Sequence, residues 1–179
     1  MAEPCPECGF SYDSVSPGGA PDAIRAFGRR YRAPLARLLA GEDEGVLRVR
    51  PEPAVWSALE YACHVRDVLS VYRERVTLVQ AEDEPVLEPM GRDERPARDR
   101  YNEQDPAVVV DELAAAADAL AADLASLDDA AWARTGIHQY PEPAPRSLVW
   151  MAANVVHEGN HHLLDIGRVL RTVRERSRS

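Results

Sequence analysis

Four long segments of this chain are predicted to be helices, and almost no stretch shows the alternating pattern of a strand. Apolar residues in the first two segments recur with the period of an amphipathic helix. Four long helices that must each bury an apolar face against one another predict an all-α fold, a four-helix bundle. The segments are residues 21–40, 57–79, 105–126 and 147–174.

The starts of three segments carry helix-capping signals. Ser57 is followed three residues later by Glu60, the pattern of a capping box. Asp105 precedes Pro106, an N-cap residue followed by a proline at the first helical position. Ser147 is predicted to cap the last segment. These local signals fix where the helices begin, whereas Pro34 predicts a bend or break in the first one.

The connections predict how the helices are ordered. Residues 82–104 are acidic, contain proline and lack a period, so they form a long crossover rather than a tight turn. Such a crossover lets the third helix run in the same direction as the second, which gives an up-down-down-up order. Residues 1–20 are rich in Pro, Gly, Ser and Cys and are predicted to be an irregular arm, with the bundle over 21–179.

Charge and composition exclude several classes of function. The net charge of −9 argues against a nucleic-acid partner, because phosphate contacts need a basic surface. No apolar run has the length of a membrane span, and the N-terminus lacks the order of a signal peptide, so we expect no membrane partner and a cytoplasmic location. Three cysteines without an export signal do not predict a disulfide framework.

Three of the five histidines lie within the short stretch 157–162. His157 and His161 are one helical turn apart, the spacing at which one helix presents two imidazoles to a single ion. Helical phase places His162 well away from His157, so we expect only His161 to share the inward face. His64, at the edge of the second helix's apolar stripe, is the natural third ligand.

A plainer interpretation stays open for the same residues. A histidine at the edge of an apolar stripe is usually a hydrogen-bonded interfacial side chain. Two buried histidines lower each other's pKa unless something compensates them. Either an ion or nearby carboxylates would do so, and Glu158, Asp165, Glu60 and Asp67 are close in sequence.

Two stretches resemble the DinB-like superfamily: "WSALEYACHVRDVL" at 56–69 and "HEGNHHLLDI" at 157–166. The resemblance covers roughly residues 22–172. It implies a four-helix bundle that binds one divalent ion, most often zinc or nickel, through three histidines. Carried over to this chain, those ligands are His64, His157 and His161. The resemblance also implies a homodimer.

The same resemblance suggests what the ion does. The superfamily is similar to the N-terminal domain of mycothiol-dependent maleylpyruvate isomerase and includes low-molecular-weight-thiol transferases. It therefore implies a metal-dependent thiol S-transferase, in which the ion holds mycothiol as a thiolate and a cleft holds a small electrophile. The alternatives are a non-catalytic or stress-related metal-binding homodimer and a metal-dependent hydrolase with Glu60 or Glu158 as base. Asn154 either orients a bound water or makes an interhelical amide bond. Arg168 is the only arginine whose position suggests a role in binding substrate.

The sequence "CPECGF" at 5–10 resembles one knuckle of a zinc ribbon. The chain has no second Cys-x-x-Cys, and Cys63 is expected to point opposite the apolar stripe, so a site of four cysteines is impossible within one chain. The alternatives for Cys5 and Cys8 are an inert or flexible arm, a knuckle completed by His138 or carboxylates, a site shared between two chains, and a reversible dithiol. We expect Cys5→Ser with Cys8→Ser to leave a three-histidine ion bound.

Overall fold

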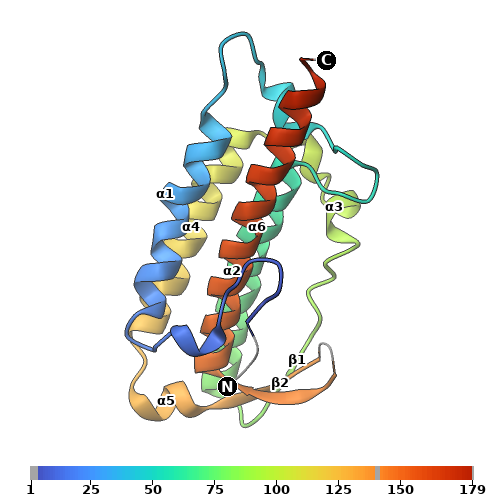
Figure 1. Cartoon of the computed structure of the whole chain (residues 1–179). Helices are drawn as coiled ribbons and strands as arrows, with labels where there is room; N and C mark the ends of the chain where they lie inside the picture. Colours follow the sequence, from blue (N-terminus) through green and yellow to red (C-terminus); the bar gives the residue numbers. More distant parts are fainter. Residues whose placement is uncertain (1–3, 140–141, 179) are drawn as a thin grey trace.

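The computed structural model describes residues 4–139 and 142–178, and its four long helices form a bundle (Figure 1). These helices are α1 (Ala20–Ala36), α2 (Ala58–Ala81), α4 (Pro106–Ala125) and α6 (Leu148–Arg176). In Figure 1, α1 and α6 run upward, whereas α2 and α4 run downward. The structure thus confirms the predicted all-α four-helix bundle and its up-down-down-up order.

Each predicted helix start is built from the expected hydrogen bonds. Ser57 Oγ accepts from the backbone N–H of Glu60 at 3.1 Å, and Glu60 Oε2 accepts from the backbone N–H of Ser57 at 2.9 Å. The side chain of Asp105 accepts from the backbone at the start of α4, and that of Ser147 does the same for α6. These acceptors satisfy backbone donors that have no partner inside the helix.

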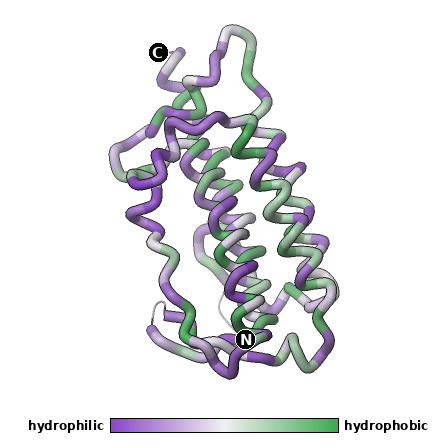
Figure 2. The backbone as a smooth tube through the Cα atoms, turned by 180° about the vertical axis from the view of Figure 1, so that it is seen from behind, coloured by the Kyte–Doolittle hydropathy of each residue, from purple (hydrophilic) through white to green (hydrophobic). Residues whose placement is uncertain are grey.

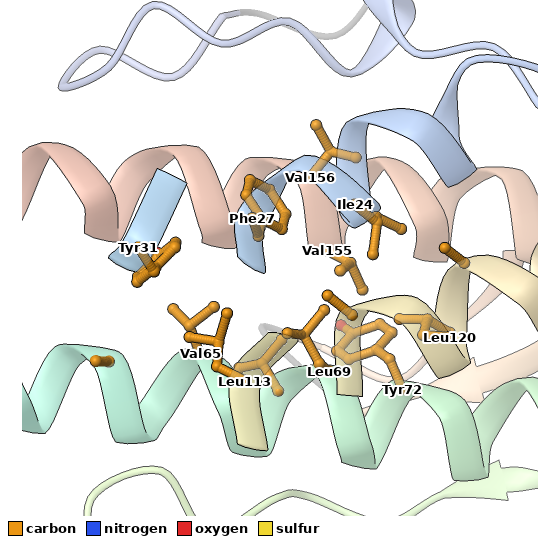
Figure 3. Close-up of a cluster of buried hydrophobic side chains, with 14 of the residues drawn as sticks. Ile24, Phe27, Tyr31, Val65, Leu69, Tyr72, Leu113, Leu120, Val155 and Val156 are labelled. Atoms are coloured by element: carbon orange, nitrogen blue, oxygen red, sulfur yellow. The ribbon is translucent and has the colours of Figure 1, made fainter. Parts of the chain in front are cut away.

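The helices close a ring in which α1 packs on α4 and α6, and α2 packs on the same two helices from the other side. Hydrophobic and hydrophilic residues are interspersed along each helix (Figure 2), and the buried residues recur at helical spacing. The apolar faces meet in a continuous core between the helices (Figure 3). Within the described part of the chain, no helix is both long enough and apolar enough to cross a membrane.

The connections contain short elements that were not predicted from the sequence. The crossover from α2 to α4 includes β1 (Val86–Leu87), α3 (Arg95–Arg98) and the 3-10 turn η3 (Tyr101–Glu103). The link from α4 to α6 includes α5 (Asp129–Ala133), β2 (Thr135–His138) and β3 (Ala144–Ser147). Two further 3-10 turns are η1 (Tyr12–Ser14) and η2 (Glu44–Arg48).

The three strands form one small sheet at the end of the bundle, in the order β1-β2-β3. β1 pairs with β2 in parallel, with Val86 opposite Ile137, and β2 pairs with β3 antiparallel, with Gly136 opposite Arg146. Strands of two to four residues are too short to show an alternating pattern, which is why they leave no sign in the sequence. The sheet fastens the crossover to the segment that leads into α6.

The first helix ends earlier than predicted. It continues through Pro34 but stops at Ala36 instead of residue 40. A proline removes a hydrogen bond and crowds the preceding turn, so a helix that contains one rarely extends far beyond it. Leu38 and Leu39, which fall inside the predicted helix 21–40 but beyond the end of α1, are exposed.

Gly159 of α6 lies directly against the ring of Phe27 of α1. A Cβ atom at this position would overlap the ring of Phe27, which is fully buried and has no room to move. We expect Gly159→Ala to lower the free energy of unfolding by about 1–3 kcal/mol, as over-packing of a core does. Urea denaturation followed by circular dichroism measures this change.

Gly167 supplies the matched control, because it lies on the same helix and a Cβ atom added to it would have no neighbour within 4 Å. Gly167→Ala is expected to raise the free energy of unfolding by about 0.5–1 kcal/mol through helix propensity. Equal effects from the two substitutions would show that the contact with Phe27 does not limit the packing of α6.

Candidate metal centre

The histidines of α6 enter three groups of ligand-type side chains. One of these groups, His161, His162 and Asp165, lies within α6 alone, and the other two join α6 to different parts of the chain. His162 joins Glu158 from its own helix and His64 from α2, with one ligand atom of each within 4.8 Å of the others. His157 and His161 instead lie with Cys5 and Cys8 of the N-terminal arm, also within 4.8 Å of one another. The three residues expected as one ligand set, His64, His157 and His161, are thus not brought together as a group.

The reason is the rotation of α6. The helical phase expected from the sequence has His161 inward and His162 outward, but His162 is only 4% exposed and faces α2. Leu164, which lies on the same side of α6 as His157 and His161, is 47% exposed. The correct helical phase could have been predicted from three apolar residues that are buried on the same side of α6 as His162. They are Val155, Ile166 and Val169.

The first group, which we call the His64–Glu158–His162 site, is compact. Glu158 Oε2 lies 3.4 Å from His64 Nε2 and 3.3 Å from His162 Nε2. The two imidazole rings meet edge to face, with centroids 4.9 Å apart. All three donors therefore converge between α2 and α6.

These separations suit one bound ion. Two nitrogen or oxygen ligands on a tetrahedral Zn²⁺, with bonds of about 2.0–2.1 Å, lie about 3.3 Å apart. The observed distances of 3.3 and 3.4 Å agree with that value. Two imidazoles and one carboxylate form a donor set that zinc enzymes use, and it leaves one coordination position for water or substrate. The residues present thus fit a divalent ion.

Neighbouring groups orient the donors. His162 Nδ1 lies 3.0 Å from Asp165 Oδ2, and Asp165 also accepts from Arg168 at 3.0 Å. A carboxylate on the far nitrogen of a metal-ligating histidine fixes the ring and its tautomer. Arg168, which was singled out from the sequence for a role in binding substrate, therefore supports Asp165 and also donates to the backbone oxygen of Glu7 at 3.1 Å.

The charges at this site are mutually dependent. Burial lowers the pKa of His64. Burial would also lower the pKa of His162, but the hydrogen bonds of His162 to Asp165 and Glu158 outweigh this effect and raise that pKa. Burial would raise the pKa of Glu158, yet the hydrogen bonds to His162 and His64 hold that pKa well below its usual value. Glu158 is thus an anion at neutral pH, ready to bind a cation.

A pocket of about 480 Å³ opens on this site, and His64 and Glu158 form part of its wall. Its volume is that of a site for a small molecule. Arg75 of α2 and Arg92 of the crossover also line it, two arginines that were not singled out from the sequence. The remaining lining residues are Val68, Tyr72, Pro89, Met90, Gly91, Asp93, Glu94, His138, Gln139 and Asn154.

A chain of hydrogen bonds joins the arm to this pocket. Tyr12 OH donates to Asn154 Oδ1 at 2.6 Å, and Asn154 Nδ2 donates to Tyr72 OH at 2.6 Å. Tyr72 OH in turn lies 3.2 Å from His138 Nε2, at the end of β2. Asn154 thus makes an interhelical amide bond, one of the two alternatives considered for it, and at the same time presents its side chain to the pocket.

Glu60 and Cys63 are held by structural contacts. Glu60 closes the capping box and forms an ion pair with Arg50, and it does not line the pocket. Cys63 is fully buried rather than pointing away from the core, with Sγ 3.8 Å from the backbone oxygen of Tyr101. Burial raises the pKa of the Cys63 thiol to about 12, so it stays protonated.

The second group, which we call the Cys5–Cys8–His157–His161 site, fastens the arm to α6. Cys5 Sγ lies 3.7 Å from His161 Nδ1. Burial would raise the pKa of Cys5, but hydrogen bonds from the backbone of Cys8 and Glu7 and from the side chains of Cys8 and His161 lower it to about 7. The knuckle thus meets the two histidines rather than His138, the histidine partner considered from the sequence.

Fold and site together define a four-helix-bundle protein with three side chains that could hold a metal ion beside a pocket. The chain belongs to the DinB superfamily, whose sequence profile matches residues 28–166. Among solved structures it is similar to YfiT from Bacillus subtilis, with a TM-score of 0.78, 16% identity, and coverage of 89% of this chain and 90% of that one. YfiT is described as a probable metal-dependent hydrolase with an unusual four-helix bundle topology. A search of curated proteins found no match.

Proposed function

We propose that this protein is a metal-dependent enzyme that transfers a low-molecular-weight thiol of the mycothiol type to a small electrophile. The proposal rests on one observation: the donors of the His64–Glu158–His162 site are spaced for a single ion, and two of them line a pocket of about 480 Å³. An ion held there is within reach of any molecule that enters the pocket. Its proposed identity is zinc or nickel.

Each part of the pocket has a defined role in this proposal. A divalent ion bound by the three donors supplies a Lewis acid that lowers the pKa of a coordinated thiol or water. Asp165 holds His162 in place, and Glu158 contributes negative charge. Arg75 and Arg92 place two guanidinium groups on a wall that also carries Asp93, Glu94 and Glu158, and a guanidinium favours a thiol or electrophile that carries a carboxylate.

Asn154 and Tyr72 complete the wall with polar groups that hydrogen-bond the substrate. Both are themselves held in place by the chain of bonds from Tyr12 to His138. Burial raises the pKa of Tyr72 to about 12, so its hydroxyl remains a donor at neutral pH. Preorganised donors of this kind fix the orientation of a small ligand.

Metal-dependent hydrolysis is the second candidate. Two histidines and a glutamate form the zinc donor set of several hydrolytic enzymes. YfiT, which shares the fold, is described as a probable metal-dependent hydrolase. Glu60 is paired with Arg50, and Glu158 is one of the three proposed metal ligands. The general base of a hydrolytic reaction would therefore be another carboxylate of the pocket, Asp93 or Glu94.

An assay with reconstituted protein separates the two candidates. The zinc- and nickel-loaded forms are incubated with monobromobimane and either mycothiol or bacillithiol, and in parallel with activated esters in the absence of thiol. Turnover that needs both thiol and metal supports the transferase, whereas turnover with water alone supports the hydrolase. The control is a His64→Ala variant carried through the same loading.

A loaded protein that binds metal at this site but turns over neither substrate class would overturn both enzymatic candidates. It would leave a non-catalytic metal-binding protein, which the family resemblance suggests is a homodimer. Light scattering across a range of concentrations tests that assembly, because a constant monomer mass would reject it.

A further inference from the structure

The N-terminal arm brings a second complete set of metal ligands onto α6. Cys5 and Cys8 come from the arm, and His157 and His161 come from the helix more than a hundred residues later. In Figure 1 the arm lies against α6, and η1 contacts this helix as well. The ligand spacings, Cys-x-x-Cys and His-x-x-x-His, are those of closed structural zinc sites.

The backbone of the knuckle is shaped to present two thiols to one point. The N–H of Gly9 donates to the backbone oxygen of Cys5 at 2.8 Å, and the N–H of Cys5 donates to that of Phe10 at 2.8 Å. Gly9 has a φ of 71°, a backbone conformation that glycine adopts without strain. The turn is therefore formed by the polypeptide itself and holds Cys5 and Cys8 beside each other.

The two histidines are held by the nitrogens that face away from the thiols. His157 Nδ1 lies 3.3 Å from Tyr12 OH, and His161 Nε2 lies 3.2 Å from Glu7 Oε2. A carboxylate or hydroxyl on the far nitrogen is the usual support of a metal-ligating histidine. The arm thus supplies both the cysteines and the groups that orient their histidine partners.

The remaining nitrogens are the ones left for an ion. His157 Nε2 is buried and has no hydrogen-bond partner among the residues that the structure describes. His161 Nδ1 lies 3.7 Å from Cys5 Sγ. A sulfur and a nitrogen on one tetrahedral Zn²⁺, with bonds of about 2.3 and 2.0 Å, lie about 3.5 Å apart. The observed separation is close to that of two ligands of one ion.

We propose that Cys5, Cys8, His157 and His161 bind a second divalent ion, Zn²⁺, in a closed tetrahedral site separate from the His64–Glu158–His162 site. Four protein donors leave no position for substrate, so this ion is structural. Two thiolates balance its charge. A reversible dithiol, the rival interpretation, needs the two cysteines alone and gives no role to the buried nitrogen of His157.

The ion would anchor the arm beside the pocket. Tyr12 stacks on Trp150 with ring centroids 5.7 Å apart and donates to Asn154, which lines the pocket. Phe10 packs on His157, with centroids 5.2 Å apart. Fixing Cys5 and Cys8 to α6 therefore also fixes the residues that position Asn154.

Cobalt substitution tests this site without relying on activity. Metal-free full-length protein is titrated with Co²⁺ under reducing conditions, and bound metal is counted by elemental analysis. We expect about two ions per chain and a thiolate-to-cobalt charge-transfer absorption in the near ultraviolet, which only a cysteine-containing site produces. Cys5→Ser with Cys8→Ser should abolish this absorption and halve the bound metal.

Two control variants separate the sites. Cys63→Ser removes the buried thiol elsewhere and should keep the absorption. His64→Ala with His162→Ala should lose one ion but also keep the absorption, so failure of the proposed function and failure of this site are distinguishable. If wild-type protein binds Co²⁺ with no thiolate absorption, the proposal is wrong, and this outcome does not depend on whether any variant folds.

Discussion

His162→Ala is expected to empty the His64–Glu158–His162 site and to reduce metal-dependent turnover by more than about 100-fold. Loss of a group that merely supports a ligand costs about 10–100-fold in affinity or activity, and loss of the ligand itself should cost more. His162 is buried against His64 and 3.3 Å from Glu158, so no other side chain replaces it. Isothermal titration with Zn²⁺ and the thiol-transfer assay measure the two effects.

The neighbouring His161→Ala serves as the matched control, since its imidazole faces Cys5 rather than His64. It should leave the affinity of the His64–Glu158–His162 site for metal unchanged. Asp165→Asn should give an intermediate loss, because it only weakens the support of His162 Nδ1. If His161→Ala lost the metal of this site and His162→Ala kept it, the ligand set would be the one expected from the sequence.

Arg50→Ala is expected to lower the free energy of unfolding by about 3 kcal/mol, the lower end of the range for breaking a buried ion pair. Glu60 is only 3% exposed, and Arg50 is its charged partner, with Nε 2.7 Å from Glu60 Oε2. Removing the guanidinium leaves a buried carboxylate whose remaining hydrogen bond comes from the backbone N–H of Ser57. The side chain of Arg50 is 38% exposed, which places the effect at the lower end. Thermal and urea unfolding measure it.

The double variant Arg50→Ala with Glu60→Gln provides the internal control. It removes the buried charge while keeping an acceptor for the N–H of Ser57, so it should be more stable than Arg50→Ala alone. A double variant no more stable than the single one would mean that Glu60 does not depend on Arg50 for compensation. The capping bond from Ser57 would then be enough to hold the carboxylate of Glu60.

The bundle could be predicted well from the sequence because the relevant signals are local. A capping box at Ser57 and an N-cap at Asp105 act within one helical turn, and the structure contains both. The length of the crossover was enough to set the direction of α4. The small sheet escaped prediction because β1 pairs with β2 across some fifty intervening residues, and neither strand is long enough to show a pattern.

The candidate site was predicted only in part, for a different physical reason. Adjacent residues on a helix differ by about 100° in direction, so an error of one position moves a side chain to another face. The sequence identified His64 and the histidine-rich stretch of α6 but assigned His161 rather than His162 to His64. The meeting of Cys5 and Cys8 with that stretch is a tertiary contact that no local pattern encodes.

The close contact between Gly159 and Phe27 has a consequence for both groups of donors. Along α6, Gly159 follows His157 and Glu158 and precedes His161 and His162, so its contact with the ring of Phe27 fixes how this part of α6 is turned about its own axis. A turn of the helix that improved the aim of one group would misdirect the other. The packing of α1 against α6 therefore sets the orientation of both groups of donors. A change in that packing would alter both coordination geometries at once.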